Sequence, residues 1–152
     1  MGSTRFPGKV VSDIAGLSLI EHILYRLKQS KYISEIVIVT SNNKENDCLS
    51  KIAKKNNIHI IRGSENNVLG RFELAVRKFK PNNVVRICGD CPLIDPKYID
   101  RCLNALGSQK VDYLKHNCES NVHQGVDAFS ISCFEKILQY KENGIAKEHV
   151  SA

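Results

Sequence analysis

The chain has no run of apolar residues approaching the ~20 that a membrane-spanning helix requires, so no such helix is expected. Its opening stretch, MGSTRFPGKVV, contains no apolar core of the kind that marks a secretory signal. Internal repeats, low-complexity segments and a recognisable domain linker are also absent from the sequence. Hydrophobic residues make up 42% and charged residues 25% of the 152 residues, which is close to globular averages and argues against wholesale disorder. We therefore expect a single domain over residues 1–152.

Six cysteines are present, but no export signal accompanies them, so we expect reduced thiols and a cytoplasmic protein. Lysine and arginine number 22 against 16 aspartate and glutamate residues, which gives a net charge of +6. This excess favours anionic partners such as nucleotide phosphates, acidic sugars or nucleic acid. The cations are spread along the chain, whereas a DNA-binding protein would concentrate them on one helix or arm. A nucleic-acid binder nevertheless stays open as an alternative.

Hydrophobic periodicity alternates between strand and helix along the whole chain. Amphipathic stretches predict helices, and short β-branched runs predict strands covered on both faces. The predicted helices are 17–30, 45–57, 68–79, 95–107 and 132–140, and the predicted strands are 36–39, 58–61, 84–88, 112–115 and 126–131. Asp95-Pro96 is typical of a helix start, and Ser132 with Glu135 has capping-box spacing for the last helix. The alternation predicts an α/β fold with a mostly parallel sheet and helices on both faces.

The first candidate site is the loop Gly2-Ser3-Thr4-Arg5-Phe6-Pro7-Gly8-Lys9. Glycines let a backbone approach phosphate closely, and the arginine and lysine supply positive charge, so the loop could cradle a triphosphate. It is not a Walker A loop, because five residues separate Gly2 from Gly8 and Val10 stands where that motif has Ser or Thr. The dinucleotide fingerprint G-x-G-x-x-G does not occur. The alternative interpretation is a flexible amino-terminal tail.

The second candidate site follows the predicted strand 84–88, in the stretch Gly89-Asp90-Cys91-Pro92-Leu93-Ile94-Asp95. Asp90 should emerge at the carboxyl end of that strand, which is the edge where open parallel sheets bind ligands. A carboxylate facing a phosphate loop suits a magnesium ion shared between protein and phosphates. The alternatives are a plain turn, or a redox or zinc site built on Cys88-x-x-Cys91. A redox pair would start a helix and a zinc site would need further ligands, and neither is evident here.

Two weaker candidates are Asp127 and Arg71. Asp127, in Gly125-Val126-Asp127, opens a predicted strand and could approach Asp90, so that the two aspartates hold one or two metal ions. Arg71 lies on the first turn of a predicted helix, after the polar loop that begins at Gly63. A cation there gains nothing from the helix dipole. Arg71 could therefore hold an anion or a base, but a plain surface arginine is equally consistent with the sequence.

Taken in order, these stretches resemble the cytidylyltransferases that activate acidic sugars, the family of acylneuraminate and deoxyoctulosonate cytidylyltransferases. The resemblance covers essentially the whole chain and is greatest to the spore-coat-polysaccharide type of that family. The matching segments are Gly2-Ser3-Thr4-Arg5-Phe6-Pro7-Gly8-Lys9, Gly63-Ser64-Glu65, Val68-Leu69-Gly70-Arg71, Gly89-Asp90-Cys91-Pro92-Leu93-Ile94-Asp95, Gly125-Val126-Asp127 and Glu148-His149-Val150.

The resemblance implies a Rossmann-like nucleotide-diphospho-sugar transferase fold. It also implies that a sugar or sugar acid, activated for surface polysaccharide synthesis, attacks the α-phosphate of CTP and releases pyrophosphate, with Mg²⁺ as cofactor. The implied nucleotide-binding residues are Gly2, Ser3, Thr4, Arg5, Gly8, Lys9, Arg71 and Asp90. Arg5, Lys9 and Asp90 are the implied catalytic residues, and Asp90 and Asp127 the implied metal ligands. The implied partners are CTP, the sugar and a second copy of the chain, with no nucleic acid and no membrane.

The sequence also departs from the family pattern at both ends. Members of the family open with an apolar strand and an arginine before the glycine loop, and they continue well past the position of Glu148-His149-Val150. We therefore expect a chain that lacks its first strand and its carboxyl-terminal part. The alternative to an enzyme is a non-catalytic remnant that binds a nucleotide or a partner protein.

Overall fold

The computed structural model describes residues 6–108, 111–115 and 125–140. The chain divides into two compact units, each of which combines two segments of the sequence. The first unit comprises residues up to 36 together with 85–129, and the second comprises 37–84 together with the residues from 130 onward. The nucleotide-loop and aspartate candidates fall in the first unit, whereas Arg71 falls in the second.

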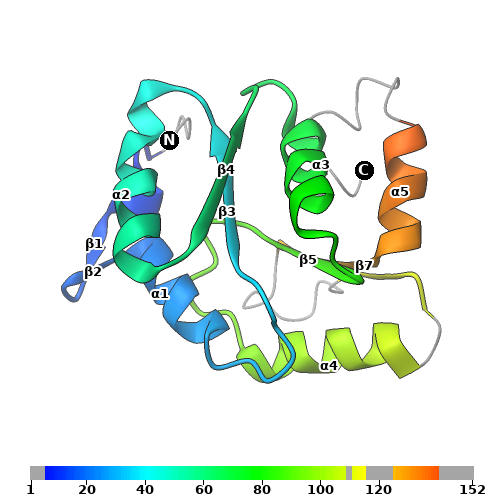
Figure 1. Cartoon of the computed structure of the whole chain (residues 1–152). Helices are drawn as coiled ribbons and strands as arrows, with labels where there is room; N and C mark the ends of the chain where they lie inside the picture. Colours follow the sequence, from blue (N-terminus) through cyan, green and yellow to red (C-terminus); the bar gives the residue numbers. More distant parts are fainter. Residues whose placement is uncertain (1–5, 109–110, 116–124, 141–152) are drawn as a thin grey trace. The chain divides into compact units, whose positions relative to one another are not determined.

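The second unit is built on two parallel strands, β3 and β4, which pair in register from Val37 opposite His59 to Ser41 opposite Gly63. Helices α2 and α3 flank this pair on its two sides (Figure 1). The described elements of this unit are β3 (Val37–Ser41), the 3₁₀ turn η2 (Lys44–Asn46), α2 (Asp47–Asn56), β4 (His59–Gly63), α3 (Val68–Phe79) and α5 (Ile131–Gln139). A parallel pair joined through a helix is the βαβ arrangement that the alternating sequence pattern predicts.

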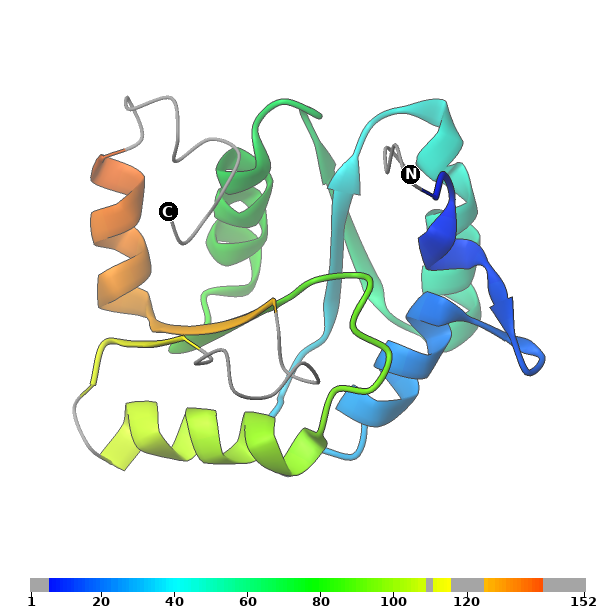
Figure 2. The ribbon, with the colours of Figure 1, turned by 180° about the vertical axis from the view of Figure 1, so that it is seen from behind.

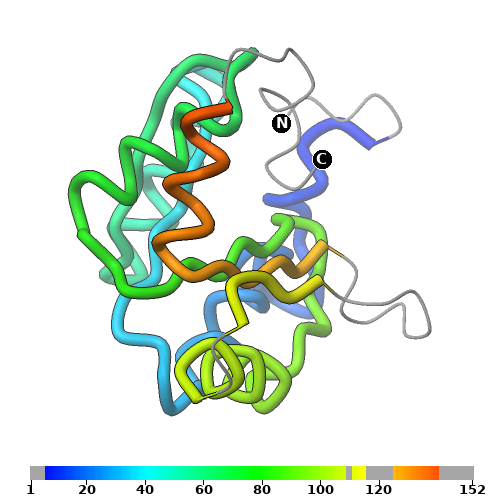
Figure 3. The backbone as a smooth tube through the Cα atoms, turned by 90° about the vertical axis from the view of Figure 1, so that its right-hand side faces the viewer, coloured from blue at the N-terminus to red at the C-terminus, as the bar shows by residue number. Residues whose placement is uncertain are grey.

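Among its described residues, the first unit contains two α-helices, the two-stranded sheet β1-β2 and most of a three-stranded sheet. Its described elements are the 3₁₀ turn η1 (Lys9–Val11), β1 (Asp13–Ile14), β2 (Leu17–Ser18), α1 (Leu19–Leu27), α4 (Pro96–Ser108), β6 (Tyr113–Lys115) and β7 (Val126–Ser130). Strand β5 (Asn83–Ile87) runs from the second unit into the first in sequence, and the strand order is β5-β7-β6. Strands β6 and β7 are antiparallel, with Tyr113 opposite Phe129. Figure 3 looks almost along α4, with β6 and β7 lying beside it.

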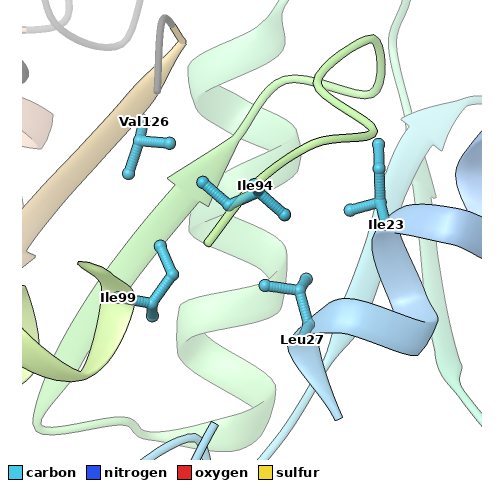
Figure 4. Packing of buried hydrophobic residues seen from close by; sticks show 5 residues of the cluster. All are labelled: Ile23, Leu27, Ile94, Ile99 and Val126. Atoms are coloured by element: carbon cyan, nitrogen blue, oxygen red, sulfur yellow. The ribbon is translucent and has the colours of Figure 1, made fainter. Parts of the chain in front are cut away.

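The core of the first unit joins elements that are distant in the sequence. Ile23 and Leu27 from α1 pack with Ile94, with Ile99 from α4 and with Val126 from β7 (Figure 4). Ile94 and Ile99 are completely buried. Because Ile94 belongs to the loop that follows Asp90, this packing fixes that loop against the helices and holds the candidate aspartate in place.

The helix limits agree with the predictions where a strong local signal marks them. Helix α3 spans the predicted residues, and its Asn67 side chain accepts a hydrogen bond from the Gly70 N–H at 2.8 Å. Helix α4 begins at Pro96, and Asp95 Oδ1 accepts from the Lys97 N–H at 2.9 Å, as the N-cap prediction requires. The capping prediction for α5 was wrong. The N-cap is Ser130, whose Oγ accepts from the Cys133 N–H at 3.1 Å, so the helix starts before the predicted Ser132.

A β-hairpin in the first unit was not predicted from the sequence. Strands β1 and β2 pair antiparallel, and the two residues between them, Ala15 and Gly16, have φ angles of 53° and 87° (Figure 2, blue). Positive φ at both central residues is the hallmark of a type I′ turn. Ala15 is an uncommon residue for that conformation, so the turn lacks its usual Asn-Gly signature. The hairpin takes up Leu17 and Ser18, which explains why α1 starts at Leu19 rather than at residue 17.

Candidate active site

The structure brings Lys9 and Asp90 into direct contact within the first unit, although they are 81 positions apart in the sequence. Lys9 Nζ donates to Asp90 Oδ2 at 2.5 Å, and the side chains are 29% and 43% exposed. Gly8 precedes the 3₁₀ turn η1 with a φ of 72°, which places Lys9 at the first position of that turn. The contact therefore joins the end of the glycine loop to the aspartate at the end of β5, on a surface that a ligand can reach.

The loop that carries Asp90 contacts both the segment at Gly125 and the turn η1. The Cys91 N–H donates to the Cys88 carbonyl at 3.3 Å, which makes residues 88–91 a hydrogen-bonded β-turn. The Cys88 N–H donates to the Gly125 carbonyl at 3.0 Å. A Cβ at Gly89 would lie 3.4 Å from Val10 Cγ1, so this glycine packs directly against η1. Three segments that the sequence analysis singled out separately thus meet around this turn.

Asp127 is held by two protein partners instead of facing an open site. Arg86 Nη1 contacts Asp127 Oδ2 at 2.8 Å, and the Tyr113 hydroxyl donates to Oδ1 at 3.0 Å. Asp127 is only 3% exposed. A buried carboxylate needs such partners, because an unpaired buried charge is strongly unfavourable. Both carboxylate oxygens therefore have protein partners in the structure, and the role of Asp127 as a metal ligand stays a prediction.

Arg86 and Tyr113 were not predicted as site residues from the sequence. The signal for Arg86 was present, because it is the one charged residue in the apolar run Val84-Val85-Arg86-Ile87 of β5. A charge at such a position requires a buried partner, and Asp127 on the neighbouring strand is the partner found. Tyr113 carried no comparable signal, since its role depends on the pairing of β6 with β7, where it stacks on Phe129 with ring centroids 4.9 Å apart.

Charges surround the Cys88 thiol on several sides. Burial raises the pKa of Cys88; Asp90 and Asp127 raise it further, whereas Arg86 and Lys9 oppose the rise. Burial likewise raises the pKa of Cys91 to about 11. Both thiols are therefore mostly protonated at neutral pH, which does not favour either sulfur atom as the nucleophile of a fast catalytic step. The electrostatic character of the site comes from the cations Lys9 and Arg86 and from the carboxylates of Asp90 and Asp127.

The Arg71 side chain, in the second unit, is hydrogen-bonded to the loop that precedes α3. Its Nη1 donates to the carbonyls of Ser64 and Glu65, at 2.6 and 2.8 Å. Burial lowers the pKa of Arg71, and the nearby Glu65 partly offsets this effect. A Cβ at Gly63 would lie 2.9 Å from Arg71 Cγ, so the glycine makes room for the arginine. These contacts hold the loop before α3 in place. A plain surface arginine would have no such role.

Gly2, Ser3, Thr4, Arg5 and the segment Glu148-His149-Val150 lie outside the residues that the structure describes. Across the described part of the chain, no three His, Cys, Asp or Glu side chains are grouped as a metal site would require. Asp90 alone still fits a hard divalent cation, because magnesium is often bound by one or two carboxylates together with phosphate oxygens and water. Among the described helices, none is long and apolar enough to cross a membrane.

Comparison with known proteins identifies the class to which this chain belongs. The profile of the cytidylyltransferase family matches residues 1–149. The chain is therefore a member of the cytidylyltransferase family, as the sequence resemblance indicated. The spore coat polysaccharide biosynthesis protein SpsF of Bacillus subtilis (strain 168) is 35% identical to it over 117 residues, which cover 74% of this chain and 49% of that protein.

Solved structures confirm the Rossmann-like α/β fold. A cytidylyltransferase from Leptospira borgpetersenii superposes with a TM-score of 0.88 at 32% identity, covering 99% of this chain and 65% of that structure. A CMP:2-keto-3-deoxy-manno-octonic acid synthetase complexed with CTP has the same fold, with a TM-score of 0.72 at 16% identity over 99% of this chain and 78% of its own. The chain spans about half the length of the curated relatives that it matches.

Proposed function

We propose that this chain carries out CTP-dependent nucleotidyl transfer to a sugar or sugar acid, with release of pyrophosphate. Family membership supports the reaction class. The observation that carries the assignment of the site is the contact between Lys9 and Asp90, which joins the glycine loop to the acidic turn. The names of the relatives, one a spore coat polysaccharide protein and others 3-deoxy-manno-octulosonate cytidylyltransferases, favour a sugar destined for a surface polysaccharide.

The proposed roles follow from charge and position. Lys9, together with Arg5 and the backbone of Gly2, Ser3, Thr4 and Gly8, binds the triphosphate and neutralises the leaving pyrophosphate. Asp90 would hold Mg²⁺, which when bound offsets the negative charge of the phosphate oxygens. For this to happen, Lys9 must leave Asp90 and turn to a phosphate oxygen, an exchange that keeps both charges paired. The partial exposure of both side chains favours this movement.

The reaction requires alignment more than covalent participation by the protein. A sugar hydroxyl attacks the α-phosphate in line with the leaving pyrophosphate, and the protein contributes placement and charge neutralisation. No cysteine nucleophile is needed. Arg71 is proposed to assist nucleotide binding indirectly, because its guanidinium holds the loop 63–67 in place. Asp127 is proposed to hold the Arg86 side chain in position. A homodimer in the cytoplasm completes the proposal, and light scattering of the purified protein tests its oligomeric state.

The test measures CTP binding by calorimetry and pyrophosphate release with a panel of sugars and sugar acids, both in the presence of Mg²⁺. Asp90→Asn should lower turnover at least about a hundredfold, since transition-state charge stabilisation is commonly worth about 10²–10³ in rate. CTP should still bind to this variant through Lys9 and the glycine loop, but with lower affinity, because the metal ligand is lost. Lys9→Ala should weaken CTP binding. Asp13→Asn and Lys97→Ala are matched controls, because both side chains are exposed and belong to the same unit.

Four outcomes separate the alternatives. CTP-dependent pyrophosphate release that requires Asp90 supports the enzyme. CTP binding that depends on Lys9, with no release for any sugar tested, supports the alternative of a non-catalytic nucleotide-binding protein. Equal CTP affinity in Lys9→Ala and Lys97→Ala, with undiminished turnover in Asp90→Asn, would remove the proposed site. Binding to oligonucleotides that survives about 150 mM salt would instead favour a nucleic-acid partner.

A further inference from the structure

Cys88 and Cys91 bracket Asp90, and the proposed reaction uses neither of them. Both are thiols in the structure and both are partly buried. The hydrogen bond from the Cys91 N–H to the Cys88 carbonyl closes a β-turn over residues 88–91. The first and last Cα atoms of a β-turn lie within about 7 Å of each other. Disulfides usually join Cα atoms that are about 4.4–6.8 Å apart, so the backbone holds the two cysteines in a range where a disulfide can form.

The two sulfur atoms also converge on one glycine. A Cβ at Gly125 would lie 2.7 Å from Cys88 Sγ and 3.4 Å from Cys91 Sγ. The sulfur atoms are therefore on the same side of Gly125, and their separation is at most the sum of these two distances. Gly125 has a φ of 78° and no side chain, so it leaves the space in which both sulfur atoms sit. Side-chain rotation within that space can bring them to the ~2.05 Å of an S–S bond.

We propose that Cys88 and Cys91 form a reversible intramolecular disulfide that closes a ring around Asp90 and lowers the affinity for metal-bound CTP. The effect on CTP rests on the proposed function, whereas the disulfide itself does not. The oxidant is a low-molecular-weight disulfide. The thiolate form of one cysteine attacks it, forms a mixed disulfide and releases a small thiol; the other cysteine then displaces the second small thiol. Because burial raises the pKa of both cysteines, this exchange is slow at neutral pH, and the samples are brought to equilibrium before they are measured. Two protein thiols are oxidised, one small disulfide is reduced to two thiols, and the two protons lost by the cysteines pass to those thiols.

The ring would act on the site because Asp90 lies inside it. In the reduced protein Cys91 Sγ lies 3.9 Å from Asp90 Oδ1, and Asp90 Oδ2 contacts Lys9. Joining Cys91 to Cys88 moves this sulfur atom and restricts the turn that aims the carboxylate. Metal ligands must be placed within about 0.2 Å of their proper distances, so a small change in the turn is enough to weaken the site. We expect the affinity for CTP in the presence of Mg²⁺ to fall at least about tenfold on oxidation, which corresponds to about 1.4 kcal/mol.

The disulfide can be detected in one peptide. The full chain is equilibrated with oxidised glutathione, treated with iodoacetamide and digested with trypsin, which cleaves after Arg86 and after Lys97. Both cysteines then lie in the peptide 87–97. The reduced protein gives this peptide with two alkyl groups, whereas the oxidised protein gives it with none and lighter by two hydrogen atoms. Calorimetry of the same samples with CTP and Mg²⁺ follows the affinity before oxidation, after oxidation and after addition of dithiothreitol.

Matched variants separate this pair from the other cysteines. Cys88→Ser removes the ring without changing Asp90, so its CTP affinity should no longer respond to oxidised glutathione. A Cys48→Ser, Cys133→Ser double variant should respond as the parent does, since both of those cysteines belong to the second unit. The loss of affinity should be reversed by dithiothreitol in the parent and in the double variant.

The outcomes distinguish the disulfide from the proposed function. A peptide 87–97 that carries two alkyl groups, or one glutathione, after equilibration would overturn the disulfide. An oxidised peptide combined with unchanged CTP affinity would overturn its effect on the site, and so would an equal loss of affinity in Cys88→Ser. If the reduced protein does not bind CTP at all, the proposed function fails, and the peptide measurement alone decides whether the disulfide forms.

Discussion

The buried pair of Arg86 and Asp127 gives the most direct test of how the site is built. If Asp127 serves as the partner of Arg86, Asp127→Asn should destabilise the protein even when no metal or nucleotide is present. The substitution leaves Arg86 buried without its counter-charge, while an amide oxygen can still accept the hydrogen bond from Tyr113. Breaking a buried ion pair by removing one partner typically costs about 3–5 kcal/mol.

The structure places the expected cost at the lower end of that range. The side chains of Arg86 and Asp127 are 18% and 5% exposed, so water reaches the guanidinium more than the carboxylate. We therefore expect Asp127→Asn to lower the free energy of unfolding by about 3 kcal/mol. Tyr113→Phe should cost about 1 kcal/mol, because it removes one hydrogen bond and keeps the stacking on Phe129.

The assay is urea unfolding of the apo protein in the presence of a chelator. An Arg86→Met, Asp127→Leu double variant forms a cycle with the Arg86→Met and Asp127→Leu single variants. The double variant should recover much of the stability lost in Asp127→Asn, since replacing a buried pair with apolar residues is often neutral. A loss below about 1 kcal/mol in Asp127→Asn, together with loss of Mg²⁺-dependent CTP binding, would refute this reasoning and would favour Asp127 as a metal ligand.

Two further predictions concern local structure. Ser130→Ala should lower the free energy of unfolding by about 1 kcal/mol and Ser132→Ala by less than half of that, because Ser130 caps α5; equal losses in urea unfolding would restore the capping box predicted from the sequence. Burial alone would raise the pKa of Asp100, but hydrogen bonds from Ser30 Oγ and from the N–H groups of Lys31 and Tyr32 outweigh it, so the pKa is lowered. A lowered carboxyl pKa contributes stability above its unfolded value, near pH 4, that is lost as the pH falls through the folded value. Unfolding midpoints measured between about pH 6 and pH 2 should therefore fall less steeply in Asp100→Asn than in the parent, and parallel curves would contradict this role.

Sequence reasoning was most successful where local signals and packing agree. In α3, the limits predicted from the apolar stripe are the observed ones, and the structure adds an Asn67 cap at the amino end and the αL residue Lys80 at the carboxyl end. The capping box predicted at Ser132 was wrong because a long-range feature sets the start of α5. Ser130 and Ser132 both suit a helix start, and the end of strand β7 at Ser130 decides between them. That choice depends on pairing between strands, which the spacing of serines does not encode.

The candidate site shows the same division between local and long-range information. The motifs around Lys9 and Asp90 were visible because each is a compact cluster of glycine and charged residues, and their meeting across 81 residues follows from the fold. The Arg86–Asp127–Tyr113 cluster was not visible as a unit. Its three members lie on different strands, and only the strand order β5-β7-β6 makes them neighbours.

The pairing of Asp127 with Arg86 has a consequence for metal binding under the proposed function. If Asp127 stays with Arg86, Asp90 is the carboxylate that would meet Mg²⁺, and one carboxylate supplies few of the six oxygen ligands that magnesium prefers. The remaining ligands would then come from phosphate oxygens and water. Metal and CTP would therefore bind together, because each completes the site for the other, and Lys9 would exchange its carboxylate for a phosphate in the same event. An ion pair between Lys9 and Asp90 in the apo protein fits this arrangement, since it keeps both charges compensated until the nucleotide and the metal arrive.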